Sequence, residues 1–176
     1  MPSPGPAQAL FFGRVEAYKG ADTLLAAWSR LGGQARLVIA GPVAAGVVLP
    51  DLPGGVELRD RLIGDEESQA LFSRSSLLVL PYRDATQSAL VAAAYFFGLQ
   101  VIVTRVGALP EYVVEGETGW VVPPDDPAAL AAALEDALSD PARLRRMGLR
   151  GQEWYRAQRH LEQAALASMY AQVVSR

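Results

Sequence analysis

The amino-acid sequence predicts a doubly wound α/β domain: a parallel sheet of about six strands, covered by helices on both faces and followed by C-terminal helices. Two observations predict it. Short, continuously apolar segments alternate with longer segments of helical character, and glycine, proline or polar residues separate them. Strands that are apolar throughout are typical of parallel sheets with both faces buried. Because such sheets bind ligands beyond the carboxyl ends of their strands, the loops after the strands form the candidate site.

Six short segments, five of them mainly apolar, are expected to form the strands. Each contains four to seven residues and is followed by glycine, proline or a polar residue, which favours a turn at that point. These segments are residues 9–12, 36–41, 56–59, 76–82, 101–104 and 119–122.

Helices are expected between and after the strands, over residues 21–33, 64–75 and 86–98 and over two segments after residue 126. Asp22 is a candidate N-cap for the first helix and Asp65 for the second. The third helix is apolar on all sides, which predicts that it is buried. Two further helix starts are indicated by Asp-Pro pairs, Asp126-Pro127 and Asp140-Pro141.

Composition limits the classes of function. The chain has 176 residues, of which 51% are hydrophobic and 20% are charged, so we expect a flexible leader over residues 1–8 and one globular domain over residues 9–176. A net charge of −3 offers no general attraction to nucleic acid. The absence of cysteine and the single histidine exclude a disulfide scaffold, a thiol nucleophile and a multi-histidine metal site. The uncharged residues 85–104 are interpreted as a buried helix and strand, not as a membrane span.

The loop after the first strand combines a glycine with two cations. Gly13 would let the backbone approach a ligand closely, and Arg14 and Lys19 would lie near a helix start at the same edge of the sheet. Lys19 is the single lysine beside fifteen arginines. Two cations and free N–H groups favour an anion such as a diphosphate, although both side chains could equally be solvated surface residues. The loop contains neither GxGxxG nor GxxxxGK[ST], which disfavours dinucleotide and Walker-type binding.

Two later loops add candidate ligand-binding residues. Thr86, Gln87 and Ser88 follow the fourth strand, where their N–H groups and hydroxyls could bind an anion, cap the next helix, or do both. Gly107 follows the fifth strand and would permit a tight turn near the ligand. Glu111 could accept hydrogen bonds from a ligand hydroxyl or from a neighbouring helix start.

These blocks together resemble the retaining, group-1 family of GT-B glycosyltransferases. The resemblance covers roughly residues 9–138 and rests on FFGRVEAYKGADTLLAAW, LVIAGP, LIGDEESQALFSRSSLLVLPY and VIVTRVGALPEYVVEGETGWVVPPDDPAALAAAL. It implies that this chain is the C-terminal, Rossmann-like half of such an enzyme, which binds the nucleotide-sugar donor. The N-terminal half, which binds the acceptor, would then be missing from this sequence.

The resemblance also implies roles for individual residues. Arg14 and Lys19 would hold the donor's diphosphate and stabilise its charge as it leaves, so that no metal or other cofactor is expected. Gly13 would keep the loop low beneath the phosphates, and the backbone near Ile63 would contact the base. The turn that presents N–H groups to the phosphates would consist of Thr86, Gln87 and Ser88.

The sequence departs from the family pattern in the third helix. The family carries a glutamate pair spaced Glu-x7-Glu, and the two positions hold Ala85 and Ala93 here. The first glutamate normally contacts the donor sugar and the second contacts the ribose. Asp84 is one residue early and is the candidate substitute for the first of them.

The resemblance therefore implies the donor-binding domain of an enzyme that transfers a sugar from a nucleoside-diphosphate sugar, such as a UDP or GDP sugar, to an acceptor. The alternative is a non-catalytic nucleotide-sugar-binding or partner-binding module of the same fold. Whether this chain alone is an enzyme stays open at this point. A cytoplasmic location is expected, with peripheral association of the full enzyme with the membrane face. Six arginines between Arg143 and Arg159 could contact anionic lipid or form a solvated helix face.

Overall fold

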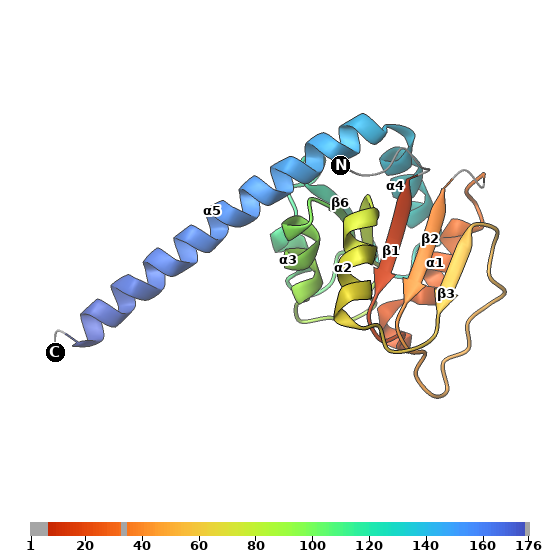
Figure 1. Cartoon of the computed structure of the whole chain (residues 1–176), viewed down its shortest axis with the longest axis horizontal. Coiled ribbons are helices and arrows are strands. Elements are labelled where there is room, and N and C mark those ends of the chain that lie inside the picture. The colour runs from red at the N-terminus through yellow and green to blue at the C-terminus, as the bar shows by residue number, and fades with distance from the viewer. Residues whose placement is uncertain (1–6, 33–34, 175–176) are drawn as a thin grey trace.

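A computed structural model describes residues 7–32 and 35–174 of the chain and confirms the doubly wound α/β fold (Figure 1). Six parallel strands form one sheet in the order β3-β2-β1-β4-β5-β6. From β1 the chain winds outward to β3, returns to β4 beside β1, and then winds in the opposite direction to β6. The strands are β1 (Gln8–Phe12), β2 (Arg36–Ala40), β3 (Val56–Arg59), β4 (Leu77–Leu80), β5 (Gln100–Thr104) and β6 (Gly119–Val122).

Helices cover both faces of this sheet. They are α1 (Ala21–Trp28), α2 (Asp65–Arg74), α3 (Ala89–Phe96), α4 (Pro127–Ser139) and α5 (Pro141–Val174), with short 3-10 helices η1 (Ala17–Lys19) and η2 (Leu109–Tyr112). Alternate strand residues point to opposite faces, so that Phe11 packs with α1 and α4 while Leu10 packs with α2 and α3. The result is two apolar cores, one on each face of the sheet, as the apolar strands predicted.

Two of the expected helix caps are wrong. Gly20 precedes α1 with a left-handed φ of 67°, and Asp22 lies inside the first turn of α1, where its carboxylate pairs with Arg83. Gly64 precedes α2, so Asp65 is the first helical residue. Both Asp-Pro starts are confirmed by side-chain caps, from Asp126 at α4 and from Asp140 at α5.

The prediction for the third helix also needs correction. This helix, α3, begins at Ala89, three residues later than expected, because Ser88 caps it. It is not buried on all sides, since only Val91, Ala94 and Tyr95 are buried and Phe96 is 71% exposed. One side of α3 packs on the sheet and the opposite side lies on the surface, so an apolar sequence here does not mean full burial.

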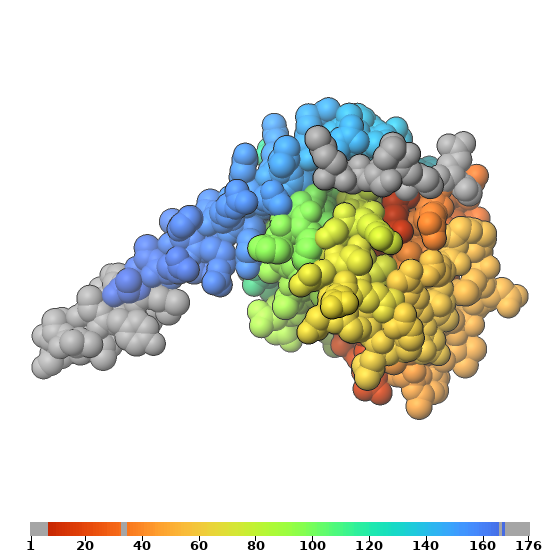
Figure 2. All heavy atoms as spheres, in the orientation of Figure 1, coloured from red at the N-terminus to blue at the C-terminus, as the bar shows by residue number. Residues whose placement is uncertain are grey.

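The last helix extends well beyond the body of the domain (Figures 1 and 2). α5 runs unbroken from Pro141 to Val174 and includes the segment expected to form a separate amphipathic helix. Its first part packs on α3 and α4, whereas residues 161–165 are exposed. Within the described residues, no helix combines the length and the apolar character that crossing a membrane requires. Of the expected leader, residues 1–6 lie outside the described residues and Gln8 already belongs to β1.

Candidate functional site

The candidate site lies where the strand order reverses, between the carboxyl ends of β1 and β4. These two strands are neighbours in the sheet, but the connections that follow them leave in opposite directions. Loops therefore diverge at this point, which is the usual place for a ligand in doubly wound sheets. The two loops are residues 13–20 after β1 and residues 81–88 after β4.

Lys19 occupies this reversal point. The structure brings its ammonium group over Gly13, because a methyl group added to Gly13 would lie 3.3 Å from the Lys19 Nζ. The same Nζ lies 5.9 Å from the ring centre of Tyr18 and 5.8 Å from that of Tyr82, within cation–π range. Burial lowers the pKa of Lys19, and the nearby Glu16 carboxylate partly opposes that effect. A half-buried cation thus spans the loops after β1 and β4.

Arg14 lies differently from the other predicted cation. Its side chain is 63% exposed, and its Nε lies 3.7 Å from the Glu16 carboxylate. The loop therefore holds Lys19 close to Gly13 and leaves Arg14 at the surface. The role of both residues toward a diphosphate stays a prediction.

The loop after β4 places its predicted residues around the start of α3. The Ser88 hydroxyl accepts a hydrogen bond from the Leu90 N–H at 3.3 Å, so the predicted capping role is confirmed for Ser88. Thr86 and Gln87 precede the helix and are exposed, as is Asp84. Because α3 begins after them, the N–H groups of Thr86 and Gln87 belong to a loop and not to a helix terminus.

Gly107 joins the loop after β5 to the same region. It has a left-handed φ of 48°, and a methyl group on it would overlap the carbonyl oxygen of Ala85. Beside it, the Ala108 N–H donates to the carbonyl oxygen of Thr86 at 3.0 Å. The predicted tight turn thus packs directly against the loop after β4. Glu111 lies in η2 with an exposed side chain and neither caps a helix nor forms an ion pair among the described contacts.

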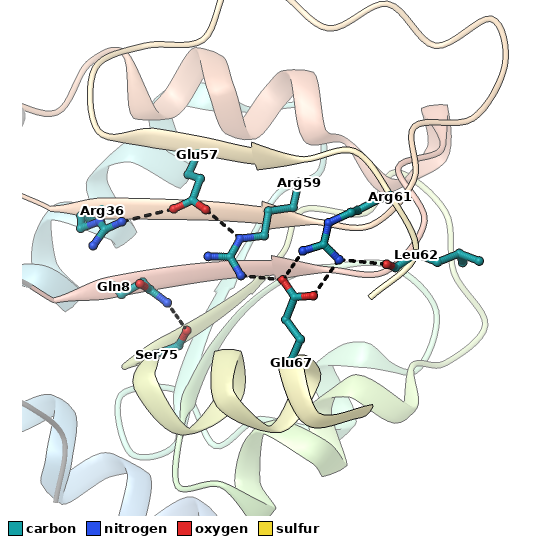
Figure 3. Close-up of polar contacts among 8 residues, drawn as sticks. All are labelled: Gln8, Arg36, Glu57, Arg59, Arg61, Leu62, Glu67 and Ser75. Atoms are coloured by element: carbon teal, nitrogen blue, oxygen red, sulfur yellow. Dashed lines mark hydrogen bonds and ion pairs between the residues drawn. The ribbon is translucent and has the colours of Figure 1, made fainter. Parts of the chain in front are cut away.

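An ion-pair network joins β3 and the loop after it to α2 (Figure 3). Arg61 forms two hydrogen bonds of 2.7 Å with the Glu67 carboxylate, and Arg59 donates to the same carboxylate at 2.7 Å. These guanidinium groups hold the pKa of Glu67 below its usual value. Ile63 itself is half-buried against the core beneath α2 and α3. Arg61, two residues before Ile63, is thus joined to α2 at the carboxyl end of β3.

The sequence analysis missed Arg83, which follows β4 and has more side-chain partners than any predicted residue. Its Nη2 donates to the Asp22 carboxylate at 2.7 Å and to the Thr23 hydroxyl at 3.0 Å. Its Nη1 donates to the Ala17 carbonyl oxygen at 2.7 Å, and its Nε donates to the Asp125 carboxylate. Arg83 and Asp22 form a tight ion pair, which raises the pKa of Arg83 and lowers that of Asp22. We call Arg83, Asp22, Thr23 and Asp125 the Arg83 cluster. The signal available in the sequence was that Asp22, Arg83 and Asp125 all follow predicted strands, at one edge of the sheet.

Chemically, this edge of the sheet is suited to binding an anion. It presents the half-buried ammonium group of Lys19, which lies between the rings of Tyr18 and Tyr82 and close to Gly13. In residues 7–32 and 35–174, no group of three histidine, aspartate or glutamate side chains is arranged to hold a metal ion.

Together, the doubly wound sheet and the cation at its reversal point are typical of α/β domains that bind ligands beyond the carboxyl ends of their strands. The model of the family "Glycosyl transferases group 1" matches residues 6–140, and the chain belongs to this family.

Curated relatives agree with this membership. The chain is 32% identical over 158 residues to a D-inositol 3-phosphate glycosyltransferase of Streptomyces avermitilis, with 79% of this chain and 34% of that protein covered. It is 36% identical over 155 residues to a glycogen synthase of Mycobacterium tuberculosis, with 82% of this chain and 37% of that protein covered. The chain thus spans about a third of the length of these relatives.

Solved structures share the fold. A sucrose-phosphate synthase of Thermosynechococcus elongatus superimposes with a TM-score of 0.79 at 27% identity, over 99% of this chain and 47% of the other. The C-terminal domain of a group 1 family glycosyl transferase, LpcC of Francisella tularensis, gives 0.75 at 18% identity over 88% of this chain and 86% of the other. Anabaena HepE, solved in complex with UDP, gives 0.77 at 15% identity over 93% of this chain and 48% of the other. This chain thus has the fold of the C-terminal half of a GT-B enzyme.

Proposed function

We propose that this domain binds the nucleoside-diphosphate sugar donor of a glycosyltransferase that transfers the sugar to an acceptor. The acceptor would bind to an N-terminal half that this sequence does not contain. The observation that carries the proposal is the Lys19 ammonium group, held over Gly13 at the reversal of strand order.

The chemistry of this position supports a diphosphate ligand. When the sugar is transferred, negative charge develops on the leaving phosphate, and a fixed cation stabilises that charge most effectively where water is partly excluded. Lys19 is half-buried and packed between two loops, whereas the more exposed Arg14 is suited to attract the anion from solution. Among proteins of the same fold, HepE was solved with UDP and with UDP-glucose.

The remaining predicted residues have supporting roles in this proposal. Thr86 and Gln87 would offer N–H groups to the phosphates, the backbone around Ile63 would contact the base, and Asp84 and Glu111 would reach sugar hydroxyls. The full enzyme would act in the cytoplasm, at the membrane face if its acceptor is a lipid.

Calorimetric titration with UDP, GDP and ADP tests the proposal. One of these is expected to bind, and Lys19→Ala should weaken its binding by about 1.5–3 kcal/mol, the range for hydrogen bonds to charged groups. Arg14→Ala should cost less, because its side chain is 63% exposed.

Arg36→Ala is the matched control. Arg36 is a cation at the amino end of β2, where it pairs with Glu57 at 3.2 Å, so its removal changes the net charge equally at the opposite edge of the sheet. If Arg36→Ala and Lys19→Ala lost equal affinity, the loss would come from the change in net charge and not from the position of Lys19, and the proposal would be overturned.

A second candidate function is a non-catalytic nucleotide-sugar-binding or partner-binding module. It is favoured by Ala85 and Ala93, which place no carboxylate where the family's glutamate pair stands. The two functions differ in whether a complete enzyme transfers sugar. Joining this domain to the acceptor-binding half of the natural protein and assaying transfer from the nucleotide sugar that binds would distinguish them.

A further inference from the structure

The Arg83 cluster surrounds the segment that carries Lys19. The Arg83 backbone N–H donates to the Tyr18 carbonyl oxygen at 2.7 Å, and its guanidinium donates to the Ala17 carbonyl oxygen at 2.7 Å. Ala17 and Tyr18 are the two residues directly before Lys19. On the other side of Lys19, the same guanidinium binds Asp22 and Thr23 in the first turn of α1. One side chain from the loop after β4 thus binds the chain on both sides of Lys19, at Ala17 in η1 and at Asp22 and Thr23 in the first turn of α1.

Asp125 provides a second, independent sign that this arrangement is specific. In the described part of the chain it is the one residue other than glycine with a left-handed backbone, at a φ of 53°. Such a conformation persists where the surroundings impose it. Here the Asp125 carboxylate accepts from Arg83 Nε and, at 3.4 Å, from the Thr23 hydroxyl. The loop before α4 is therefore joined to Arg83 and to the first turn of α1.

The partners of Arg83 show that its guanidinium group is not available to bind a phosphate. All three of its guanidinium nitrogens donate to protein oxygens, and two of these partners are carboxylates. Two negative charges around one positive charge leave no surplus cation for a phosphate. Lys19, by contrast, has aromatic rings and glycine around its ammonium group and forms no ion pair among the described contacts.

We propose that Arg83 is a positioning residue, which holds η1 so that the Lys19 ammonium group stays above Gly13. This inference rests on the proposed function, because the ammonium group is positioned for the donor's diphosphate. It gives Arg83 an effect on binding that acts entirely through Lys19.

A double-mutant cycle tests this directly. The affinity of the purified chain for the nucleoside diphosphate that binds it is measured in Arg83→Met, in Lys19→Ala and in the double variant. Arg83→Met is expected to weaken binding about tenfold, a size typical of residues within one network. In the Lys19→Ala background the same change should have almost no further effect.

The single lysine provides a readout that a general loss of stability would not move. Protein grown with [13C]lysine gives one Cε signal, from Lys19. The order parameter of that carbon is expected to fall in Arg83→Met, because the turn before it is no longer held. Arg143→Met is the matched control: Arg143 is similarly exposed, at 36% against 30%, and pairs with Asp136 at 2.8 Å near Trp120. It should leave the Lys19 signal and the affinity unchanged.

The outcomes separate the two proposals. If Lys19→Ala binds nucleotide as well as the unmodified chain, the proposed function fails at its central residue. If Lys19→Ala weakens binding but the Arg83→Met effect is unchanged in its background, Arg83 acts independently and the present inference fails. If Arg83→Met does not fold, Asp22→Asn replaces it, because this change removes the charge of one Arg83 partner and keeps the shape of the Asp22 side chain. A double-mutant cycle of Asp22→Asn with Lys19→Ala then tests whether the effect on binding acts through Lys19.

Discussion

Gly107 connects two of the loops at the candidate site. Its left-handed backbone and its lack of a side chain let the loop after β5 press against the carbonyl oxygen of Ala85. Any Cβ at this position would force the loop after β4 to move, and that loop carries Thr86 and Arg83. The close contact between Gly107 and Ala85 therefore helps to hold the loop after β4 in place at the candidate site.

We predict that Gly107→Ala destabilises the fold more than a left-handed backbone alone explains. The backbone conformation should cost about 1–2 kcal/mol, and the overlap with Ala85 should add about 1–3 kcal/mol. Unfolding in urea, followed by circular dichroism, measures the sum. Gly116→Ala is the control, because Gly116 also has a positive φ, of 76°, but no atom lies within 4 Å of its added methyl group. Equal losses in both variants would show that the overlap is relieved at no cost.

Among single residues, the sequence can predict candidate site residues that lie close together along the chain. Gly13 and Lys19 lie six positions apart in one loop, and both fall at the predicted edge of the sheet. Arg83 could not be found in this way, because its partners Asp22 and Asp125 are 61 and 42 residues away. The same long-range pairing explains why Asp22 is not the expected cap: its carboxylate binds a guanidinium that the local sequence does not reveal.

Among the helices, α3 departs furthest from its prediction. The sequence is apolar on all sides, yet Phe96 is exposed and Ala93 is half-buried. Hydrophobic pattern alone could not predict this, because it does not show what lies against a helix. The strands were predicted within one or two residues, since for all but β3 both faces are covered and a continuous apolar run is then sufficient.

We predict that Ala93→Glu folds and binds the nucleoside diphosphate more tightly. A half-buried position lets the carboxylate reach solvent, and a hydrogen bond from the ribose would add about 1.5–3 kcal/mol. Calorimetry measures the gain, and a 2′,3′-dideoxynucleotide should abolish it. Ala92→Glu serves as the control, because Ala92 is also half-buried but lies about 100° around the helix. If Ala92→Glu gave the same gain, the ribose would not be its source.

For the whole molecule, the described residues form one α/β half with the candidate site open at its edge. A transferase must hold donor and acceptor together, and this contributes about 7–11 kcal/mol to a bimolecular step. A chain that holds the donor alone loses most of that contribution.

We therefore predict that the purified 176-residue chain transfers no sugar at a useful rate. Incubation with a radiolabelled nucleotide sugar and a panel of acceptors should yield at most slow release of free sugar. The inactivated double variant Lys19→Ala with Arg14→Ala gives the background rate. Efficient formation of a glycosylated acceptor by this chain would contradict the prediction.

The two parts of the projecting helix α5 should exchange their backbone amide hydrogens with solvent at very different rates. α5 has 34 residues, and packing against α3 and α4 protects only its first part. Beyond that part, residues 161–165 lie in water, and a helix without tertiary contacts is marginal at a length of about 12–15 residues. Backbone amides near Leu144 should consequently exchange with solvent deuterons as slowly as those of the sheet, while amides beyond His160 should exchange orders of magnitude faster. A partner that covers the projecting half would slow the second group and leave the first unchanged, so deuterium uptake along this one helix would reveal both the partner and the place where it binds.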